Sequence, residues 1–253
     1  MKMTLIYGVH AIKARLKLHV AGVDIMFCLK GKENSPRISE LKSLMAKKSI
    51  EFTLINKQKF QELLQVHGLE GCVHQNVLAL CNNVIKIYEE SDLIHLVHTC
   101  RSVPFILMLD CVKDPHNLGA CIRSAEAVGV DFMVFPKDNS ATINATVEKV
   151  ASGAASNMKL VAVTNLSRAI SILKDHGIWV TGLAGESEGL LYEVDLTGSV
   201  ALIVGAEDSG LRFGTRKVCD FLARLPMQGE VSSLNVSVAA GVAMYEVVRQ
   251  RLN

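Results

Sequence analysis

The feature that most constrains the fold is a regular alternation of apolar runs and helix-patterned segments from Val103 to the C-terminus. Residues 105–109 form a continuous apolar run, which is typical of a strand buried in a parallel sheet. Further strands are expected at residues 131–135, 160–163, 178–181, 200–204 and 222–225, with a closing helix at 235–251. This alternation predicts an α/β fold in which helices cover both faces of a parallel sheet.

The first third of the chain carries a separate α/β pattern on a smaller scale. Helices are expected at residues 8–18, 37–48 and 57–65, and strands at 23–29, 50–55 and 77–80. The pattern is lost over residues 82–103, apart from a short helix. We therefore predict one domain at 1–81, a linker at 82–103 and a second domain at 104–253.

Charge is divided unevenly between these parts. Residues 1–85 hold 12 Lys and Arg against 6 Asp and Glu, whereas the rest of the chain holds 15 against 19. A basic first third favours a polyanionic partner, although a solvated lysine-rich face explains the charge equally well.

Composition excludes several classes of protein. No apolar run is long enough to span a membrane, and the N-terminus has no signal-peptide pattern, so we expect a cytoplasmic protein with no membrane partner. The seven cysteines form no Cys-x-x-Cys pair, and His95 and His98 have no further ligand nearby in sequence. We therefore expect buried thiols, packing histidines and no metal site.

Polar clusters follow three of the expected strands, at the sheet edge where ligands of parallel sheets bind. The first cluster is residues 109–126, in which Asn117 is expected to begin a helix and Arg123 lies off its apolar stripe. Arg123 suits a phosphate, but a helix cap with an exposed arginine explains the cluster equally well. The cluster lacks the glycine pattern of a Rossmann nucleotide site and of a P-loop.

The other two clusters follow the expected strands at 200–204 and 222–225. In the second cluster, Gly205 permits close backbone approach to a ligand, and Glu207 follows in a turn. In the third cluster, Ser232, Ser233 and Asn235 precede a helix of small residues. A helix cap accounts for one of these three polar residues, but not for all of them.

Taken together, the clusters resemble the motifs of the SpoU/TrmH family in the SPOUT superfamily of RNA methyltransferases. Those motifs read D-P-x-N-L-G…R-x-A, G-x-E-x-x-G and P-M-x-G-x-x-x-S-L-N-V-S, and this chain keeps each of their fixed positions. The similarity extends to residues 7–11, to His74 and Gln75, and to residues 136–138, so it covers nearly the whole chain. It is greatest to the RlmB branch, bacterial 23S rRNA (guanosine-2′-O-)-methyltransferases.

The resemblance implies a catalytic domain whose last segment forms a deep trefoil knot around S-adenosylmethionine (SAM). It implies that SAM contacts six residues from four segments of the chain, namely Leu183, Gly185, Gly205, Leu225, Met227 and Leu234. Arg123 is expected to bind the phosphate beside the target ribose and to help activate its 2′-hydroxyl. The residues expected to orient the ribose and Arg123 are Asn117, Glu207, Ser233 and Asn235.

The resemblance also implies a ribosomal-protein-like RNA-binding domain at the N-terminus and a homodimer with its active site near the subunit boundary. Residues expected to contact RNA are Lys30, Lys32, Arg37, His74 and Gln75. Asn76 stands where the family more often has glycine. The expected partner is 23S rRNA. The alternatives are the same chemistry on tRNA, or a catalytically inactive RNA-binding or ribosome-assembly protein.

Overall fold

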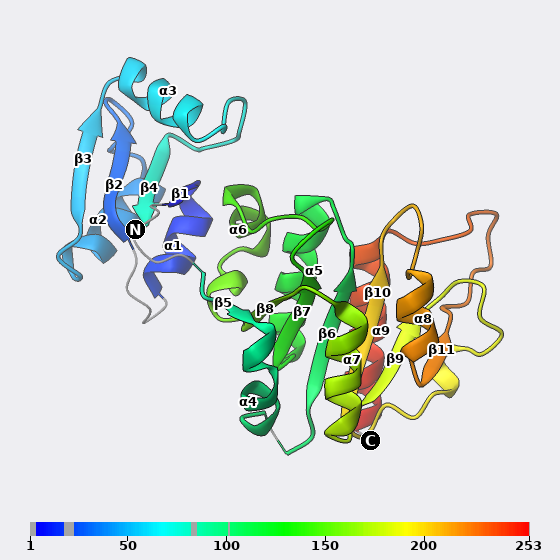
Figure 1. The fold of residues 1–253 in the computed structure, drawn as a ribbon. Helices are drawn as coiled ribbons and strands as arrows, with labels where there is room; N and C mark the ends of the chain where they lie inside the picture. The colour runs from blue at the N-terminus through cyan, green and yellow to red at the C-terminus, as the bar shows by residue number, and fades with distance from the viewer. Residues whose placement is uncertain (1–3, 18–22, 82–84, 101, 253) are drawn as a thin grey trace. The chain divides into compact units, whose positions relative to one another are not determined.

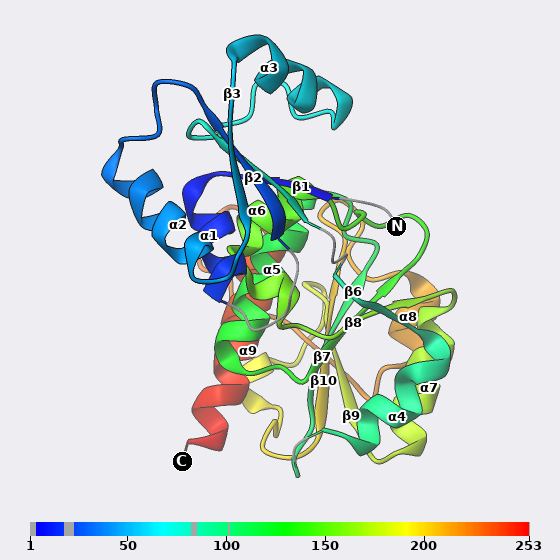
Figure 2. The same cartoon turned by 90° about the vertical axis from the view of Figure 1, so that its left-hand side faces the viewer.

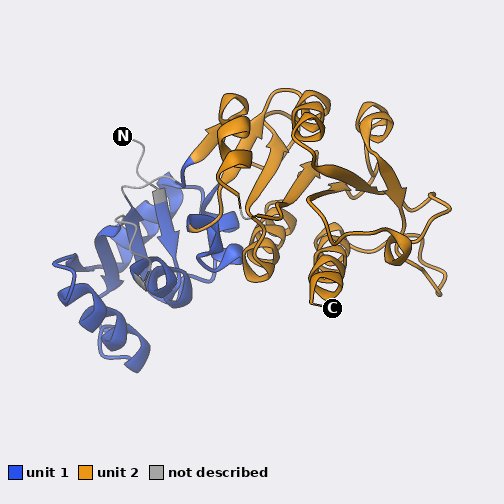
Figure 3. Ribbon diagram, turned by 90° about the horizontal axis from the view of Figure 1, so that it is seen from below, with its two compact units in different colours: residues 1–86, 143–156 blue, residues 87–142, 157–253 orange. Residues whose placement is uncertain are grey.

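The structure, a computed structural model, describes residues 4–17, 23–81, 85–100 and 102–252 (Figure 1). Leu18 of the first expected helix, and residues 82–84 and 101 of the expected linker, lie outside the described residues. The chain forms two compact units (Figure 3). Unit 1 comprises residues 1–86 and 143–156, and unit 2 comprises residues 87–142 and 157–253.

Unit 1 contains a mixed four-stranded sheet. Its strands are β1 (Thr4–Tyr7), β2 (Val23–Leu29), β3 (Glu51–Ile55) and β4 (Val77–Cys81), in the order β1-β4-β2-β3. β2 and β3 run parallel, whereas β4 runs antiparallel to both β1 and β2. The three predicted strands are confirmed. β1 was not predicted, since four residues are too few to show a pattern.

Three helices of unit 1 cover this sheet: α1 (Val9–Lys17), α2 (Pro36–Ala46) and α3 (Lys57–Val66). The Ser35 side chain caps α2 and the Asn56 side chain caps α3. Ile12 and Leu41 lie in one buried cluster with the sheet, and Phe60 lies in a second cluster beneath α3.

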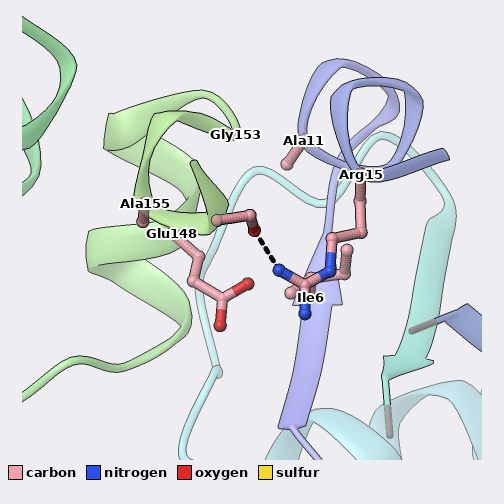
Figure 4. Close-up of a pocket in the computed structure, with 7 residues that line it drawn as sticks. Ile6, Ala11, Arg15, Glu148, Gly153 and Ala155 are labelled. Atoms are coloured by element: carbon pink, nitrogen blue, oxygen red, sulfur yellow. Dashed lines mark hydrogen bonds between the residues drawn. The ribbon is translucent and has the colours of Figure 1, made fainter. Parts of the chain in front are cut away.

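Residues 143–156 complete unit 1 although they come much later in the chain. They form α6 (Ala145–Ala151) and a 3-10 turn (Ala154–Ser156). Gly153 has a φ of +93°, and a Cβ there would lie 2.6 Å from the Cβ of Ala14, so only glycine allows this close packing. The Arg15 guanidinium donates to the Ser156 hydroxyl beside Glu148, at a cavity of about 10 Å³ (Figure 4). Burial raises the pKa of Glu148, and the charge of Arg15 opposes that rise.

Unit 2 contains a seven-stranded sheet in the order β11-β9-β10-β6-β7-β8-β5, and every pair of neighbours is parallel. Its strands are β5 (Ile87–Glu89), β6 (Phe105–Asp110), β7 (Phe132–Pro136), β8 (Leu160–Val163), β9 (Trp179–Leu183), β10 (Val200–Gly205) and β11 (Phe221–Ala223). The predicted parallel sheet is confirmed. β5 lies within the range expected to be a linker.

Helices cover both faces of this sheet, as predicted (Figure 2). The helices are α4 (Leu93–His98), α5 (Pro115–Val128), α7 (Leu166–Asp175), α8 (Phe213–Val218) and α9 (Val236–Arg251), with 3-10 turns at Glu90–Asp92 and Leu191–Glu193. α4 and α7 share a buried cluster with one face of the sheet, including Met108 and Ile203. α5 and α9 pack together on the other face.

No helix in the described part of the chain is long and apolar enough to cross a membrane. The trefoil knot stays a prediction, because strand order and pairing do not define how the last loop is threaded.

Candidate active site

A pocket of about 530 Å³ lies where β9, β10 and β11 reach their carboxyl ends. Its volume falls within the range of pockets that enclose small ligands. The six residues expected to hold a cofactor all line it: Leu183, Gly185, Gly205, Leu225, Met227 and Leu234. They come from four separate segments of the chain, so the fold brings together residues that the sequence only suggested as a set.

The loop after β10 forms one wall of the pocket and depends on Gly205. A Cβ at this position would lie only 2.0 Å from the backbone carbon of Gly210, so no other residue fits without backbone movement. Ala206 and Gly210 exchange backbone hydrogen bonds of 3.1 and 2.9 Å, and Gly210 adopts a φ of +63°. The loop is therefore a tight hairpin that carries Glu207 near its tip.

The pocket combines apolar walls with acidic groups. Leu183, Leu225 and Leu234 contribute apolar surface, whereas Glu207 and Asp208 are carboxylates. These features suit a ligand with an apolar part and a positive charge.

Asn117 connects two of the strand-end clusters through its side-chain amide. Its Nδ2 donates to Glu207 Oε1 at 2.5 Å, and its Oδ1 accepts from Asn235 Nδ2 at 3.0 Å. Asn117 is buried, whereas Glu207 and Asn235 are exposed. Glu207 and Asn235, which follow Asn117 by 90 and 118 positions in the chain, thus join it in one hydrogen-bonded network at the edge of the pocket.

The first turn of each flanking helix explains how this network is held. Asn117 does not begin α5, contrary to the sequence-based expectation. Asp114 is the cap, its carboxylate accepts from the His116 N–H at 2.9 Å, and Pro115 is the first helical residue. Asn235 does cap α9, because its Oδ1 accepts from the N–H groups of Ser237 and Val238. The Nδ2 of the same Asn235 side chain donates to Asn117 Oδ1.

The remaining catalytic candidates are placed differently. Ser233 is exposed and lines the pocket beside Ser232. Arg123 is exposed on α5 and is not among the residues that line the pocket. The structure therefore brings four of the five candidates to one sheet edge, and Arg123 follows Asn117 by six residues in α5. Like Arg123, Asn117 and Asn235 do not themselves line the pocket.

Two residues that sequence reasoning did not single out also contribute here. Asp110, the last residue of β6, is completely buried and pairs with Arg212 at 2.6 Å. Its position at the end of an apolar run was the available signal, since a carboxylate there needs a partner. Arg224 lines the pocket, and no local pattern marked it.

The basic candidates in unit 1 are accessible. Lys30 and Lys32 lie exposed in the turn after β2, and Arg37 lies exposed in the first turn of α2. Because these three residues are close together in the chain, the turn and the start of α2 present three positive charges to solvent.

His74 and Gln75 hold the turn before β4. The His74 ring packs against Phe60 at 4.8 Å, and its Nδ1 accepts from the Asn76 N–H. Burial, assisted by the nearby charge of Lys149, lowers the pKa of His74. The Gln75 side chain accepts from the Val9 N–H at 2.8 Å, at the start of α1. Asn76 has a φ of +64°, a conformation that asparagine tolerates better than most residues, which explains how it replaces glycine.

The seven cysteines are all buried or partly buried. All seven cysteines are free thiols, and no group of three or more His, Cys, Asp or Glu is arranged to hold a metal ion in the described ranges. Burial, with a smaller effect of Glu207, raises the pKa of Cys121 to about 12. His98 in α4 packs edge-on against His176 at 5.5 Å.

Comparison with known families decides what this arrangement is. The sequence model described as "SpoU rRNA Methylase family" matches residues 104–245. The chain belongs to the SpoU rRNA methylase family. A second model, described as "RNA 2'-O ribose methyltransferase substrate binding", matches residues 5–84 of this SpoU family member.

Individual relatives match along their full length. The SpoU chain is 47% identical to the 23S rRNA (guanosine-2′-O-)-methyltransferase RlmB of Pseudomonas aeruginosa, over 97% of this chain and 96% of that protein. It is 44% identical to the enzyme of the same name from Escherichia coli, over 98% of each. The fold is similar to that of the SpoU methyltransferase AviRb from Streptomyces viridochromogenes in complex with AdoMet. That comparison has a TM-score of 0.78, covers 99% of this chain and 91% of AviRb, and has 23% sequence identity.

Proposed function

We propose that this protein transfers a methyl group from SAM to the ribose 2′-hydroxyl of a guanosine in 23S rRNA. The observation that carries the proposal is that the six residues expected to bind SAM line one pocket, beside the hydrogen bonds that link Asn117 to Glu207 and Asn235. Full-length similarity to enzymes named RlmB supports 23S rRNA as the substrate.

The pocket fits SAM in size and in chemistry. The leucines that line it offer surface for the adenosine part, and the carboxylates of Glu207 and Asp208 favour a ligand with positive charge. SAM would be held by Leu183, Gly185, Gly205, Leu225, Met227 and Leu234, and it supplies an electrophilic methyl group that needs no metal.

The chain's own polar residues orient the nucleophile. Asn117 links Glu207 to Asn235, so the three side chains keep fixed relative positions where the ribose must lie. Ser233 adds a hydroxyl at the same edge. Correct alignment of reacting groups accounts for a large part of such catalysis. Arg123 binds the phosphate next to the target ribose, and its bidentate guanidinium helps to activate the hydroxyl.

Substrate RNA is held by unit 1. Lys30, Lys32 and Arg37 are exposed and neutralise phosphates, which provides affinity without base recognition. His74 and Gln75 present the adjacent turn to the RNA. We assign residues 1–81 to RNA binding, 82–103 to a linker and 104–253 to methyl transfer. The family matches at residues 5–84 and 104–245 support this assignment, whereas the structure groups residues 87–103 with unit 2 and residues 143–156 with unit 1.

The protein acts as a homodimer formed through α9. Val238, Val242 and Tyr245 are spaced along one face of this helix and are 50%, 37% and 59% exposed. Leu234, a pocket residue 39% exposed, precedes the Asn235 cap of the helix, so a second copy on this face also approaches the active site. Replacing Tyr245 with Glu should yield monomers in sedimentation equilibrium, while the wild type sediments as a dimer.

A cytoplasmic location suits both the substrate and the chemistry of the chain. All seven cysteines are free thiols, as expected in a reducing compartment.

The deciding experiment is transfer of labelled methyl from SAM to unmodified 23S rRNA, with tRNA as the parallel substrate. The product is then hydrolysed in alkali. Because a 2′-O-methyl group blocks cleavage of its own phosphodiester, ribose methylation leaves the label in an alkali-resistant dinucleotide.

Label in a dinucleotide from 23S rRNA alone is the expected result. Label in tRNA instead would contradict the assigned substrate. Label in neither RNA, with SAM binding intact in a titration, would contradict the enzymatic role on free RNA and favour a binding or assembly function.

A further inference from the structure

Asp110 makes two hydrogen bonds to a single distant residue. Its Oδ2 accepts from the backbone N–H of Arg212 at 2.9 Å, and its Oδ1 accepts from Arg212 Nε at 2.6 Å. The carboxylate is completely buried, whereas the arginine side chain is 49% exposed. The carboxylate therefore fixes both the backbone and the side chain of Arg212.

These bonds close the loop that carries Glu207. Gly205, the last residue of β10, lies opposite Asp110 in the parallel ladder, and the loop that follows it ends at Arg212. Asp110 is thus next to Gly205 and bonded to Arg212, the two residues that flank the loop at 206–211. Within the loop, Ala206 and Gly210 bind each other, which leaves Glu207 at the hairpin tip.

Asn117, the hydrogen-bond partner of Glu207, lies on the segment that follows Asp110 in the chain. The chain leaves β6 at Asp110 and reaches Asn117 in the first turn of α5, after Cys111 in a left-handed conformation with a φ of +64°. Both sides of the Asn117–Glu207 hydrogen bond are therefore anchored at Asp110.

We propose that Asp110, through its ion pair with Arg212, is a positioning residue that sets the location of Glu207 for methyl transfer. The proposal rests on the function proposed above and adds a residue to it. Asp110 is completely buried and does not line the pocket, so it acts through the loop and not by contact with the substrate.

A purely structural ion pair offers a matched control in the same sheet. Asp220 accepts from the Val180 N–H at 2.9 Å and from Lys174 Nζ at 2.7 Å, near the amino end of β9. Each aspartate accepts from one backbone N–H and one basic side chain, but Asp220 pairs with a lysine and lies at the opposite end of the strands from the pocket. Its loss should affect stability without affecting catalysis.

The experiment compares D110N, R212A, R212K and D220N with the wild type, and combines D110N with E207Q. Asparagine keeps the size of Asp110 but has only one acceptor oxygen, so one of the two Arg212 donors then faces an NH₂ group. We expect D110N and R212A to lower kcat at saturating SAM and RNA by about 100-fold, as for a small misplacement of reacting groups. R212K, which keeps the charge, should recover part of this loss, and D220N should leave kcat unchanged.

Two readouts distinguish positioning from general damage. If Asp110 acts through Glu207, D110N should lower kcat less than about threefold further in the E207Q background, because effects on one coupled unit do not multiply. Hydrogen exchange of residues 206–211 should be at least tenfold faster in D110N and R212A, and unchanged in D220N.

The proposal is overturned if the losses of D110N and E207Q multiply, or if exchange in residues 206–211 is unchanged. If D110N does not fold, R212A takes its place in the same cycle, since its side chain is half exposed. If the wild type transfers no methyl to 23S rRNA, the proposed function fails, whereas the exchange rates still decide whether this ion pair holds the loop.

Discussion

Asn117 offers the sharpest test of the hydrogen-bonded network at the pocket. Asn117→Ala removes a charge-assisted hydrogen bond to Glu207 and a neutral one from Asn235. Such bonds contribute about 1.5–3 and 0.5–1.5 kcal/mol respectively. Both partners are exposed and regain water, so we take the lower ends, which gives about 2 kcal/mol of lost stability. For a chain of this size this lowers Tm by about 4–8 °C.

Asn117→Ala should also lower the rate of methyl transfer. Without Asn117, Glu207 and Asn235 lose their common partner, and a misplacement of about 1 Å costs about 100-fold in rate. We therefore expect kcat to fall about 100-fold, while KM for RNA changes little because the basic contacts lie in unit 1. Initial rates of labelled methyl transfer under saturating SAM measure both.

A matched substitution separates the two effects. Asn165 caps α7 by accepting from the Arg168 N–H at 3.1 Å, and it lies outside the pocket lining. Asn165→Ala should cost about 1 kcal/mol of stability and leave kcat unchanged. The reasoning is refuted if Asn117→Ala lowers Tm as calculated but keeps kcat within a factor of about three of the wild type.

Three further predictions concern other parts of the molecule. Arg123→Ala should lower methyl transfer at least about 100-fold while SAM titration and RNA filter binding stay within threefold of the wild type; retained turnover would remove Arg123 from the mechanism, and Arg123→Lys tests whether charge alone suffices. Gly205→Ala places a Cβ 2.0 Å from the Gly210 backbone, so calorimetry should show SAM affinity at least tenfold weaker and a Tm several degrees lower, and unchanged affinity would mean that the loop yields freely. Hydrogen bonding to Arg168 lowers the pKa of Glu90, so this carboxylate stabilises the fold above its unfolded pKa of about 4.3, and the contribution is lost as the pH falls through the lower folded pKa. Urea unfolding of Glu90→Gln should therefore show reduced stability at pH 7 and no difference from the wild type at pH 2. An equal difference at both pH values would contradict this.

Local patterns predicted the central strands of each unit, whereas the set of pocket residues came from the family resemblance. β6 and β8 were predicted because buried parallel strands are apolar on both faces, and this marks them without knowledge of their neighbours. Gly205 was expected to allow close backbone approach to a ligand; in the structure the close neighbour is the Gly210 backbone, and the ligand contact stays a prediction. Such features depend only on residues nearby in the chain.

Features that depend on distant partners were not predicted. Asp110 pairs with a residue 102 positions later, and no local pattern specifies that choice. The start of α5 was misplaced because two local preferences compete: asparagine is a good cap, but Pro115 fixes its own φ and moves the start to Asp114. β5, with three residues, gains its pairing only from β8, which follows it by about 70 positions.

The late segment of unit 1 has a consequence for how the protein is made. Residues 1–86 leave the ribosome first, but the residues that pack against Ala14 and Arg15 follow only at positions 143–156. At about 5–20 residues per second, the nascent RNA-binding unit waits about 4–14 s for them. During that interval α1 exposes the surface that Gly153 later covers, and strands β6 and β7 emerge in between. Synthesis of the two units is therefore interleaved: unit 1 is complete only when residue 156 has been made, after residues 87–142 of unit 2 have been added.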